Sequence, residues 1–215
     1  MTDHHDALEQ LNKHIPLQEK LIVAHKSVNE QFPYIARIAI AIYDAETSIL
    51  KTYLHSSGED HPLENYQASL DDAPSLKTIL EKGLPRVVNN LLTFEDSEHE
   101  HTRRIGRQGY AASYTMPMFN EGHFFGFIFF NSYEKDVFDE KVLHQIDLYG
   151  HMISLMVINE LTAINTLKAA VKTTGGITHY RDPETGSHLD RMSRYSRLIA
   201  AELATKYDLD DTYIE

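Results

Sequence analysis

Hydrophobic side chains near the start of the chain first follow a helical period and then a strand period. The first stripe predicts a helix whose main part begins at about Pro16 and ends near Gln31–Pro33. Residues 1–16 form an N-terminal tail and helix, of which residues 1–7 are polar. Strands are expected over 34–43 and 49–55, then a polar loop over 56–72. A short helix opened by Pro74 and a short strand over 85–89 follow. The apolar stripe of the first helix consists of Leu8, Leu11, Ile15, Ile22, His25 and Val28.

A second pair of strands is expected over 110–118 and 123–131, joined by a tight turn at Asn120-Glu121-Gly122. Residues 124–130 are apolar at every position but Gly126, so this strand must be covered on both faces and lie in the centre of a sheet. Gly126 allows another backbone or a ligand to come close. The order of elements predicts an α+β fold, with an antiparallel sheet, terminal helices on one face and a loop-covered pocket on the other.

A long helix is expected over 138–173, with Asp136 or Asp139 at its start. Its apolar residues alternate at three- and four-residue spacing, as in a coiled coil, with weak points at Gly150 and Glu160. Two interpretations remain open: a terminal helix buried on its own domain, or a rod that pairs with a second chain. The seam consists of Leu143, Ile146, Gly150, Ile153, Val157, Ile164, Leu167 and Val171.

Composition narrows the classes of function. The 215 residues carry a net charge of -12, which argues against a general nucleic-acid-binding face. The chain contains no cysteine, which excludes disulfides, thiolate metal sites and thioether-linked chromophores. No apolar run is long enough to span a membrane, and the N-terminus has no signal core. We therefore expect a cytoplasmic protein that contacts neither membrane nor nucleic acid.

Three stretches together resemble a GAF domain: Ser75–Arg86, Ser113–Pro117 and Gly122–Phe138. The resemblance covers about Leu17–Leu161. It implies a domain that binds a small molecule or dimerises through its terminal helices, with a ligand that the sequence does not identify. The pattern of GAF domains that bind cyclic nucleotides is not met, because Ser132 follows Asn131 where that pattern has lysine.

The loop over 90–109 contains the candidate binding residues. Arg103, Arg104 and Arg107 form the one basic cluster of an acidic chain and could hold a phosphate or carboxylate, although exposed charge on a helical turn is the simpler interpretation. Glu98–His101 has alternating acids and histidines, which we interpret as a solvated loop rather than a metal site.

Asp182-Pro183 predicts a new helix start after a loosened stretch at Thr173–Gly176. Glu184 and His188 are four residues apart and so share one face of that helix. The run Tyr180–Leu203 strongly resembles the opening of an HD-GYP domain, a family of metal-dependent phosphodiesterases that hydrolyse cyclic di-GMP. The resemblance implies that Glu184 and His188 are metal ligands, in an iron or manganese cluster of the complete domain.

The remaining HD-GYP residues are missing: no His-Asp pair follows His188, and the sequence has no Gly-Tyr-Pro segment. We therefore expect no catalytic residue in this chain, whose residues 179–215 would be a truncated, isolated helix of an all-α domain. The expected organisation is a sensor domain at 17–160, a linker helix at 161–178 and this helix. The function expected from both resemblances is a homodimeric regulatory sensor of a bacterial cyclic-di-GMP phosphodiesterase. Alternatives are the phosphodiesterase itself, of which this would be the non-catalytic front, and a stand-alone dimeric scaffold.

Overall fold

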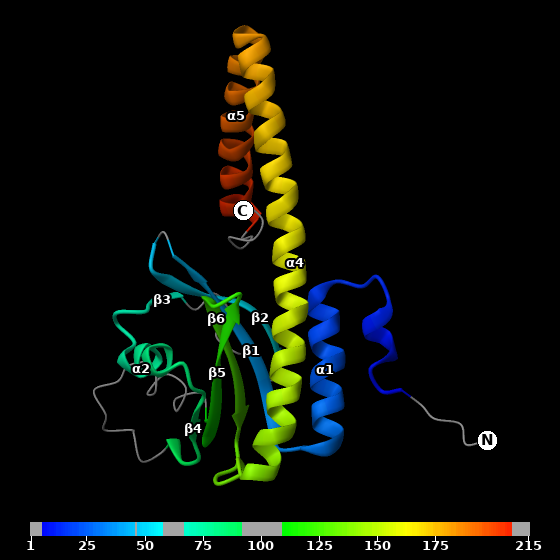
Figure 1. Cartoon of the computed structure of the whole chain (residues 1–215), viewed down its shortest axis with the longest axis vertical. Coiled ribbons are helices and arrows are strands. Elements are labelled where there is room, and N and C mark those ends of the chain that lie inside the picture. Colours follow the sequence, from blue (N-terminus) through cyan, green and yellow to red (C-terminus); the bar gives the residue numbers. More distant parts are fainter. Residues whose placement is uncertain (1–5, 46, 58–66, 92–108, 208–215) are drawn as a thin grey trace, which may run out of the picture. The chain divides into compact units, whose positions relative to one another are not determined.

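The computed structural model describes residues 6–45, 47–57, 67–91 and 109–207 (Figure 1). The chain divides into two compact units, Met1–Ile158 and Asn159–Glu215. Every described strand lies in the first unit, whereas described residues of the second unit are almost entirely helical.

The described strands form one antiparallel sheet in the order β3-β2-β1-β6-β5-β4. The predicted central position of the strand after the hairpin is confirmed, because β6 pairs with both β1 and β5. The prediction of a loop over 56–72 is wrong at β3, which forms an edge strand of the sheet. With three residues, β3 is too short to show an alternating pattern in the sequence. The strands are β1 (Ile35–Asp44), β2 (Ile49–Ser57), β3 (Gln67–Ser69), β4 (Arg86–Val88), β5 (Ala112–Asn120) and β6 (His123–Ser132).

Helices cover both faces of the sheet (Figure 1). A short 3-10 helix, η1 (Glu9–Asn12), precedes α1 (Leu17–Gln31), which lies beside the first part of α4 (Glu140–Arg181) on one face. The opposite face carries α2 (Pro74–Lys82). The predicted stripe of α1 is wrong at Ile22, which is half exposed; the apolar residues that α1 buries are Leu17, Leu21, Ala24 and Val28.

The first part of α4 is docked on the sheet through a row of buried side chains. Asp139 caps this helix as predicted, because its carboxylate accepts a hydrogen bond from the backbone N–H of Val142 at 2.9 Å. At Gly150 the helix comes so close to β5 that an added methyl group would lie 2.8 Å from Cε of Met116. The buried row consists of Val142, Ile146, Gly150, Ile153, Ser154 and Val157.

Two polar contacts fix α4 against its neighbours. The hydroxyl of Tyr114, on β5, donates a hydrogen bond to the carboxylate of Asp147. The pKa of the Tyr114 phenol is strongly raised, mainly because the phenol is buried and next because of this hydrogen bond. The hydroxyls of Tyr149 and Ser27 lie 2.9 Å apart and connect α4 to α1. The predicted layer of terminal helices on one face is therefore held by side-chain hydrogen bonds as well as by apolar packing.

His25 connects α1 to two strands. Its Nε2 lies 2.9 Å from the carbonyl oxygen of Ile35, which can only accept, so Nε2 carries the proton. Its Nδ1 lies 2.8 Å from the hydroxyl of Ser56 and accepts from it in the neutral ring. Burial lowers the pKa of His25, and the hydrogen bond to Ile35 opposes that shift.

The buried His25 predicts a loss of stability in mild acid. Because its folded pKa lies below the unfolded value of about 6.5, the unfolded chain binds more protons, and stability decreases as the pH falls from about 6.5 towards the folded pKa. The slope should approach at most about 1.4 kcal/mol per pH unit. Urea unfolding at pH 7.5 and 5.5 measures it. His25→Gln should flatten the slope, whereas His144→Gln, on an exposed position, should leave it unchanged. An equal slope in His25→Gln would contradict the assignment.

In the second unit α4 continues without a break to Arg181. The predicted loosening at Thr173–Gly176 is wrong, because Gly175 and Gly176 are both helical. The next helix, α5 (Pro183–Tyr207), starts as predicted: Asp182 accepts hydrogen bonds from the backbone N–H groups of Glu184 and Thr185 at 3.2 and 3.4 Å. Within the described ranges, no helix is both long and apolar enough to cross a bilayer.

Candidate functional site

The sheet face opposite α1 and α4 is the predicted binding face. Towards α2 it is filled by apolar side chains, with Phe124 and Phe127 packed edge to face at 4.9 Å between ring centroids. Phe129 continues this aromatic row along β6. The cluster consists of Ala39, Ala41, Leu50, Leu70, Ala73, Leu76, Ile79, Phe127 and Phe129, with Tyr43, Leu80 and Phe124 packed against it.

The same face becomes polar towards the end of β6. Asn131 is paired with Arg37 on one side and with Ser113 on the other, and Arg37 is paired with Ser57. Directly paired residues of antiparallel strands share a face, so these four side chains form one row across β2, β1, β6 and β5. The next row on this face contains His55, Ala39, Phe129, Thr115 and Arg86. Neither row contains an acidic residue. We call Ser57, Arg37, Asn131 and Ser113 the polar row.

Arg37 is the central side chain of the polar row. It is 6% exposed, and its Nε has no hydrogen-bond partner. Burial lowers the pKa of the guanidinium, and the phenols of Tyr110 and Tyr133 raise it to a smaller extent. Arginine stays protonated in proteins, so a positive charge is buried here. Among the described residues no carboxylate forms an ion pair with it.

The surroundings of Arg37 are ordered by aromatic and polar contacts. The rings of Tyr110 and Tyr133 are stacked, with centroids 4.7 Å apart. The hydroxyl of Ser113 donates to Oδ1 of Asn131 at 2.9 Å, which fixes the amide and leaves its N–H groups to donate elsewhere. Asn131 is 1% exposed. These contacts of the described residues around Arg37 are all made by neutral groups.

Sequence reasoning missed Arg37. The signal was present, because alternate residues of a strand share a face, and 37 therefore lies on the same face as Ala39, Ala41 and Tyr43. The residues proposed instead, Arg103, Arg104 and Arg107, lie outside the described residues, as does Glu98–His101.

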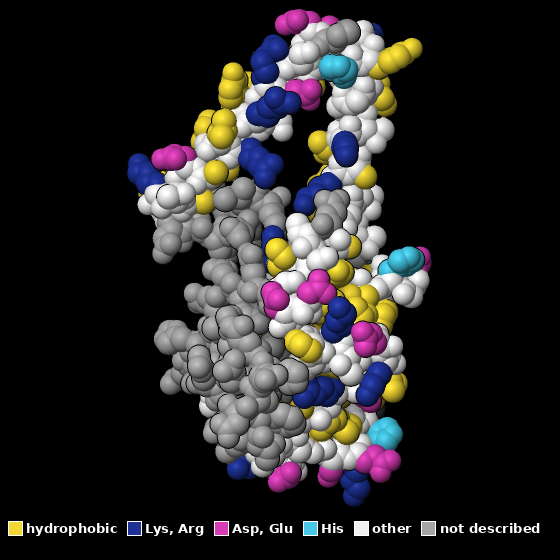
Figure 2. All heavy atoms as spheres, turned by 90° about the vertical axis from the view of Figure 1, so that its left-hand side faces the viewer, with side chains coloured by type: hydrophobic (Ala, Val, Ile, Leu, Met, Phe, Trp, Pro, Cys, Tyr) yellow, Lys and Arg dark blue, Asp and Glu magenta, His cyan; other side chains and the backbone are white. Residues whose placement is uncertain are grey.

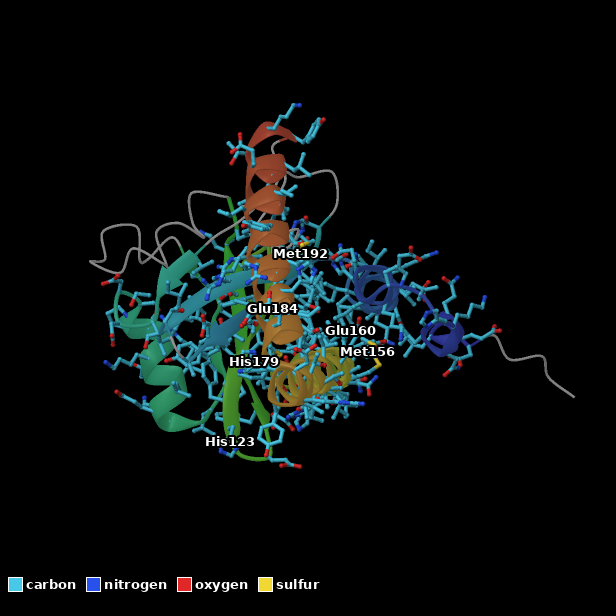
Figure 3. All side chains as sticks on the ribbon, turned by 90° about the horizontal axis from the view of Figure 1, so that it is seen from above. His123, Met156, Glu160, His179, Glu184 and Met192 are labelled. Atoms are coloured by element: carbon cyan, nitrogen blue, oxygen red, sulfur yellow. The ribbon has the colours of Figure 1, made fainter. Side chains whose placement is uncertain are left out.

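The two proposed metal ligands, Glu184 and His188, are both exposed on α5. Figure 3 places Glu184 on α5 and His179 on α4. A carboxylate oxygen of Glu184 lies 3.5 Å from a guanidinium nitrogen of Arg191. Within the described part of the chain, no three His, Asp or Glu side chains are grouped closely enough to hold a metal ion. The described residues thus offer two ligands at most, which does not suffice for a hydrolytic metal cluster.

The coiled-coil seam of α4 divides between the two units. In the first unit its residues from Ile146 to Val157 are buried on the chain's own sheet, as the first interpretation of the long helix required. In the second unit Ile164, Leu167 and Val171 are exposed, the last two to 67% and 65%. Figure 2 shows hydrophobic side chains at the surface of this unit, interspersed with Lys and Arg. On α5 the exposed apolar side chains are Leu189, Met192, Tyr195, Leu198, Ile199 and Tyr207.

Several solved GAF domains align with most of this chain. A GAF domain of a phosphoenolpyruvate-protein phosphotransferase from Coxiella burnetii aligns with 73% of this chain and 91% of its own, at TM-score 0.57 and 13% identity. The phycocyanobilin-bound GAF domain of a cyanobacterial phytochrome aligns with 70% of this chain and 89% of its own, at TM-score 0.55 and 14% identity. The GAF domain of a sensor histidine kinase from Bacillus halodurans aligns with 65% of this chain and 95% of its own, at TM-score 0.52 and 11% identity.

These similarities define the class of fold as α+β, with a helix-backed antiparallel sheet. More particularly, the chain has the GAF fold, as its sequence pattern predicted. No protein-family description matches the sequence. No curated protein matches it either.

Proposed function

We propose that this chain is the sensory and regulatory front of a bacterial cyclic-di-GMP phosphodiesterase. The observation that carries the proposal is the unbroken helix α4. It starts on the GAF-fold sheet and runs directly to Asp182, the cap of the helix that carries the HD-GYP-like motif. A change in the packing of α4 in the first unit would therefore be transmitted along one helix to the start of the catalytic domain.

Homodimerisation is part of the same proposal. The apolar stripe formed by Ile164, Leu167 and Val171 has no cover in the described chain and continues a coiled-coil spacing. A second copy of α4 would bury it. Ile22 on α1 and Leu148 and Leu155 on α4 are further exposed apolar residues, which support a contact through the N-terminal and linker helices.

The metal would be held only by the complete HD-GYP domain. Glu184 and His188, one turn apart on α5, would supply one carboxylate and one imidazole towards an iron or manganese cluster. When bound, such a metal supplies an activated water for phosphodiester hydrolysis. This chain's own contribution is to place these two ligands at a fixed distance from the end of α4.

A hydrolysis assay tests the proposal. The 215-residue chain, supplied with Mn²⁺ or Fe²⁺, should not hydrolyse cyclic di-GMP. The same chain extended through a His-Asp pair and a Gly-Tyr-Pro segment should do so. In the extended chain Glu184→Gln should lower both the rate and the metal content measured by mass spectrometry, because it removes a ligand. Glu202→Gln, also exposed on α5, is the matched control and should change neither. An inactive extended chain that binds no metal would contradict the phosphodiesterase assignment and favour the dimeric scaffold.

A further inference from the structure

We propose that the polar row is a binding site for a small organic carboxylate, held by the guanidinium of Arg37. The proposal deepens the sensory role proposed above and rests on it for its biological meaning. Anion binding itself is measurable on this chain without any catalytic domain.

The first step is the charge of Arg37. A guanidinium cannot lose its proton at physiological pH, and burying a charge without a partner costs several kcal/mol. Arg37 is buried, its Nε has no hydrogen-bond partner, and no described carboxylate pairs with it. Buried arginines are ordinarily paired with an anion. The polar row places the side chains of Ser57, Asn131 and Ser113 beside Arg37 and contains no acidic residue.

The second step is the geometry of the donors. Nε–H and the neighbouring Nη–H of arginine form a fork that matches the two oxygens of a planar carboxylate. Asn131 lies directly opposite Arg37 on β6, which places their Cβ atoms about 5 Å apart. Because the Ser113 hydroxyl donates to Oδ1 of Asn131, the amide side of Asn131 is available as a donor. The site thus offers cationic and neutral donors.

The third step concerns which anion the site selects. The protein carries a net charge of -12, so its long-range field repels anions and only short-range contacts can hold one. A polyphosphate would need several cations, whereas the polar row contains one and the adjacent row adds Arg86. A carboxylate with a single negative charge matches this small number of cations. The stacked rings of Tyr110 and Tyr133 beside Arg37 are suited to an apolar or aromatic body on the carboxylate.

Binding would affect the first unit where β6 leads into α4. Tyr133 follows the last residue of β6, and Phe138 precedes α4. The side chain of Asn89 holds the backbone of Phe138 through two hydrogen bonds, of 3.0 and 3.2 Å. A ligand between Arg37 and Asn131 would therefore be bound nine residues before the start of the helix that we propose as the relay.

Thermal unfolding and calorimetric titration of the 215-residue chain test the proposal, with acetate, benzoate and inorganic phosphate as probes in a chloride buffer. Acetate or benzoate should raise the unfolding temperature saturably by a few degrees, because a ligand that binds only the folded chain stabilises it. Arg37→Met should weaken carboxylate binding at least about tenfold, since it removes a charge-assisted hydrogen-bond pair. Arg194→Met, an exposed arginine on α5, is the matched control and should bind as the native chain does.

A second variant keeps the test decisive if Arg37→Met fails to fold. Asn131→Asp is nearly isosteric, still accepts from Ser113 and places a carboxylate opposite Arg37. It should raise the unfolding temperature in chloride alone and abolish the response to acetate and benzoate. The proposal is overturned if no carboxylate stabilises the native chain, if the response persists in Asn131→Asp, or if phosphate alone binds. These outcomes are independent of the hydrolysis assay, so the two proposals can fail separately.

Discussion

Gly126→Ala is expected to destabilise the first unit by at least about 3 kcal/mol, enough to prevent accumulation of folded protein. A methyl group at this position would lie 2.2 Å from the carbonyl oxygen of Ala41 and 3.0 Å from Cε of Met118. Met118 can move its flexible end, but the Ala41 carbonyl belongs to the backbone of β1, a central strand. Relief would require the β1–β6 pair to separate, and this pair forms the middle of the sheet.

Gly175→Ala is the matched control and should stabilise the folded chain rather than destabilise it. Gly175 is helical, and a methyl group there meets no atom within 4 Å. Alanine in a helix interior is favoured over glycine by about 1 kcal/mol. Urea unfolding followed by circular dichroism measures both variants, with soluble yield as a second readout for Gly126→Ala. A Gly126→Ala protein as stable as the native chain would show that β1 and β6 do not approach as closely as described.

The fold was predictable where the relevant signals are local. The turn at Glu121-Gly122 and the start of α5 at Asp182-Pro183 are encoded in two or three neighbouring residues, and both form as predicted. Gly126 was expected to allow a close approach, and the backbone of β1 makes it. The predicted break at Gly175-Gly176 failed because glycine only lowers helix stability by about 1 kcal/mol per residue and does not forbid the helix.

The partner of the long helix was not predictable from its spacing. Packing on a sheet and packing on a second helix both require apolar residues every three or four positions. Ile146 and Leu167 are therefore equivalent in the sequence, yet the first is fully buried on its own domain and the second is exposed. Arg37 was missed for a related reason: its significance depends on which side chains face it from β5 and β6, far along the chain.

Leu167→Glu combined with Val171→Glu is expected to convert a dimer of this chain to a monomer. Both side chains are exposed to about two thirds and occupy successive positions of the coiled-coil seam. In a paired rod, four new carboxylates per dimer would replace four buried apolar side chains and repel one another, which should weaken association by at least about 100-fold. Sedimentation equilibrium over a range of protein concentrations measures the dissociation constant directly.

Ala169→Glu is the matched control, because 169 lies on the side of the helix opposite this seam and is also exposed. It adds one negative charge per chain to the same stretch of helix, where the double variant adds two, and it should leave the dimer intact. Equal weakening by Ala169→Glu would show that net charge, rather than the seam, controls association. A native chain that remains monomeric at high concentration would remove the dimeric rod from the proposal. Signal transfer along α4 would then have to occur within one chain, through the buried row that ends at Val157.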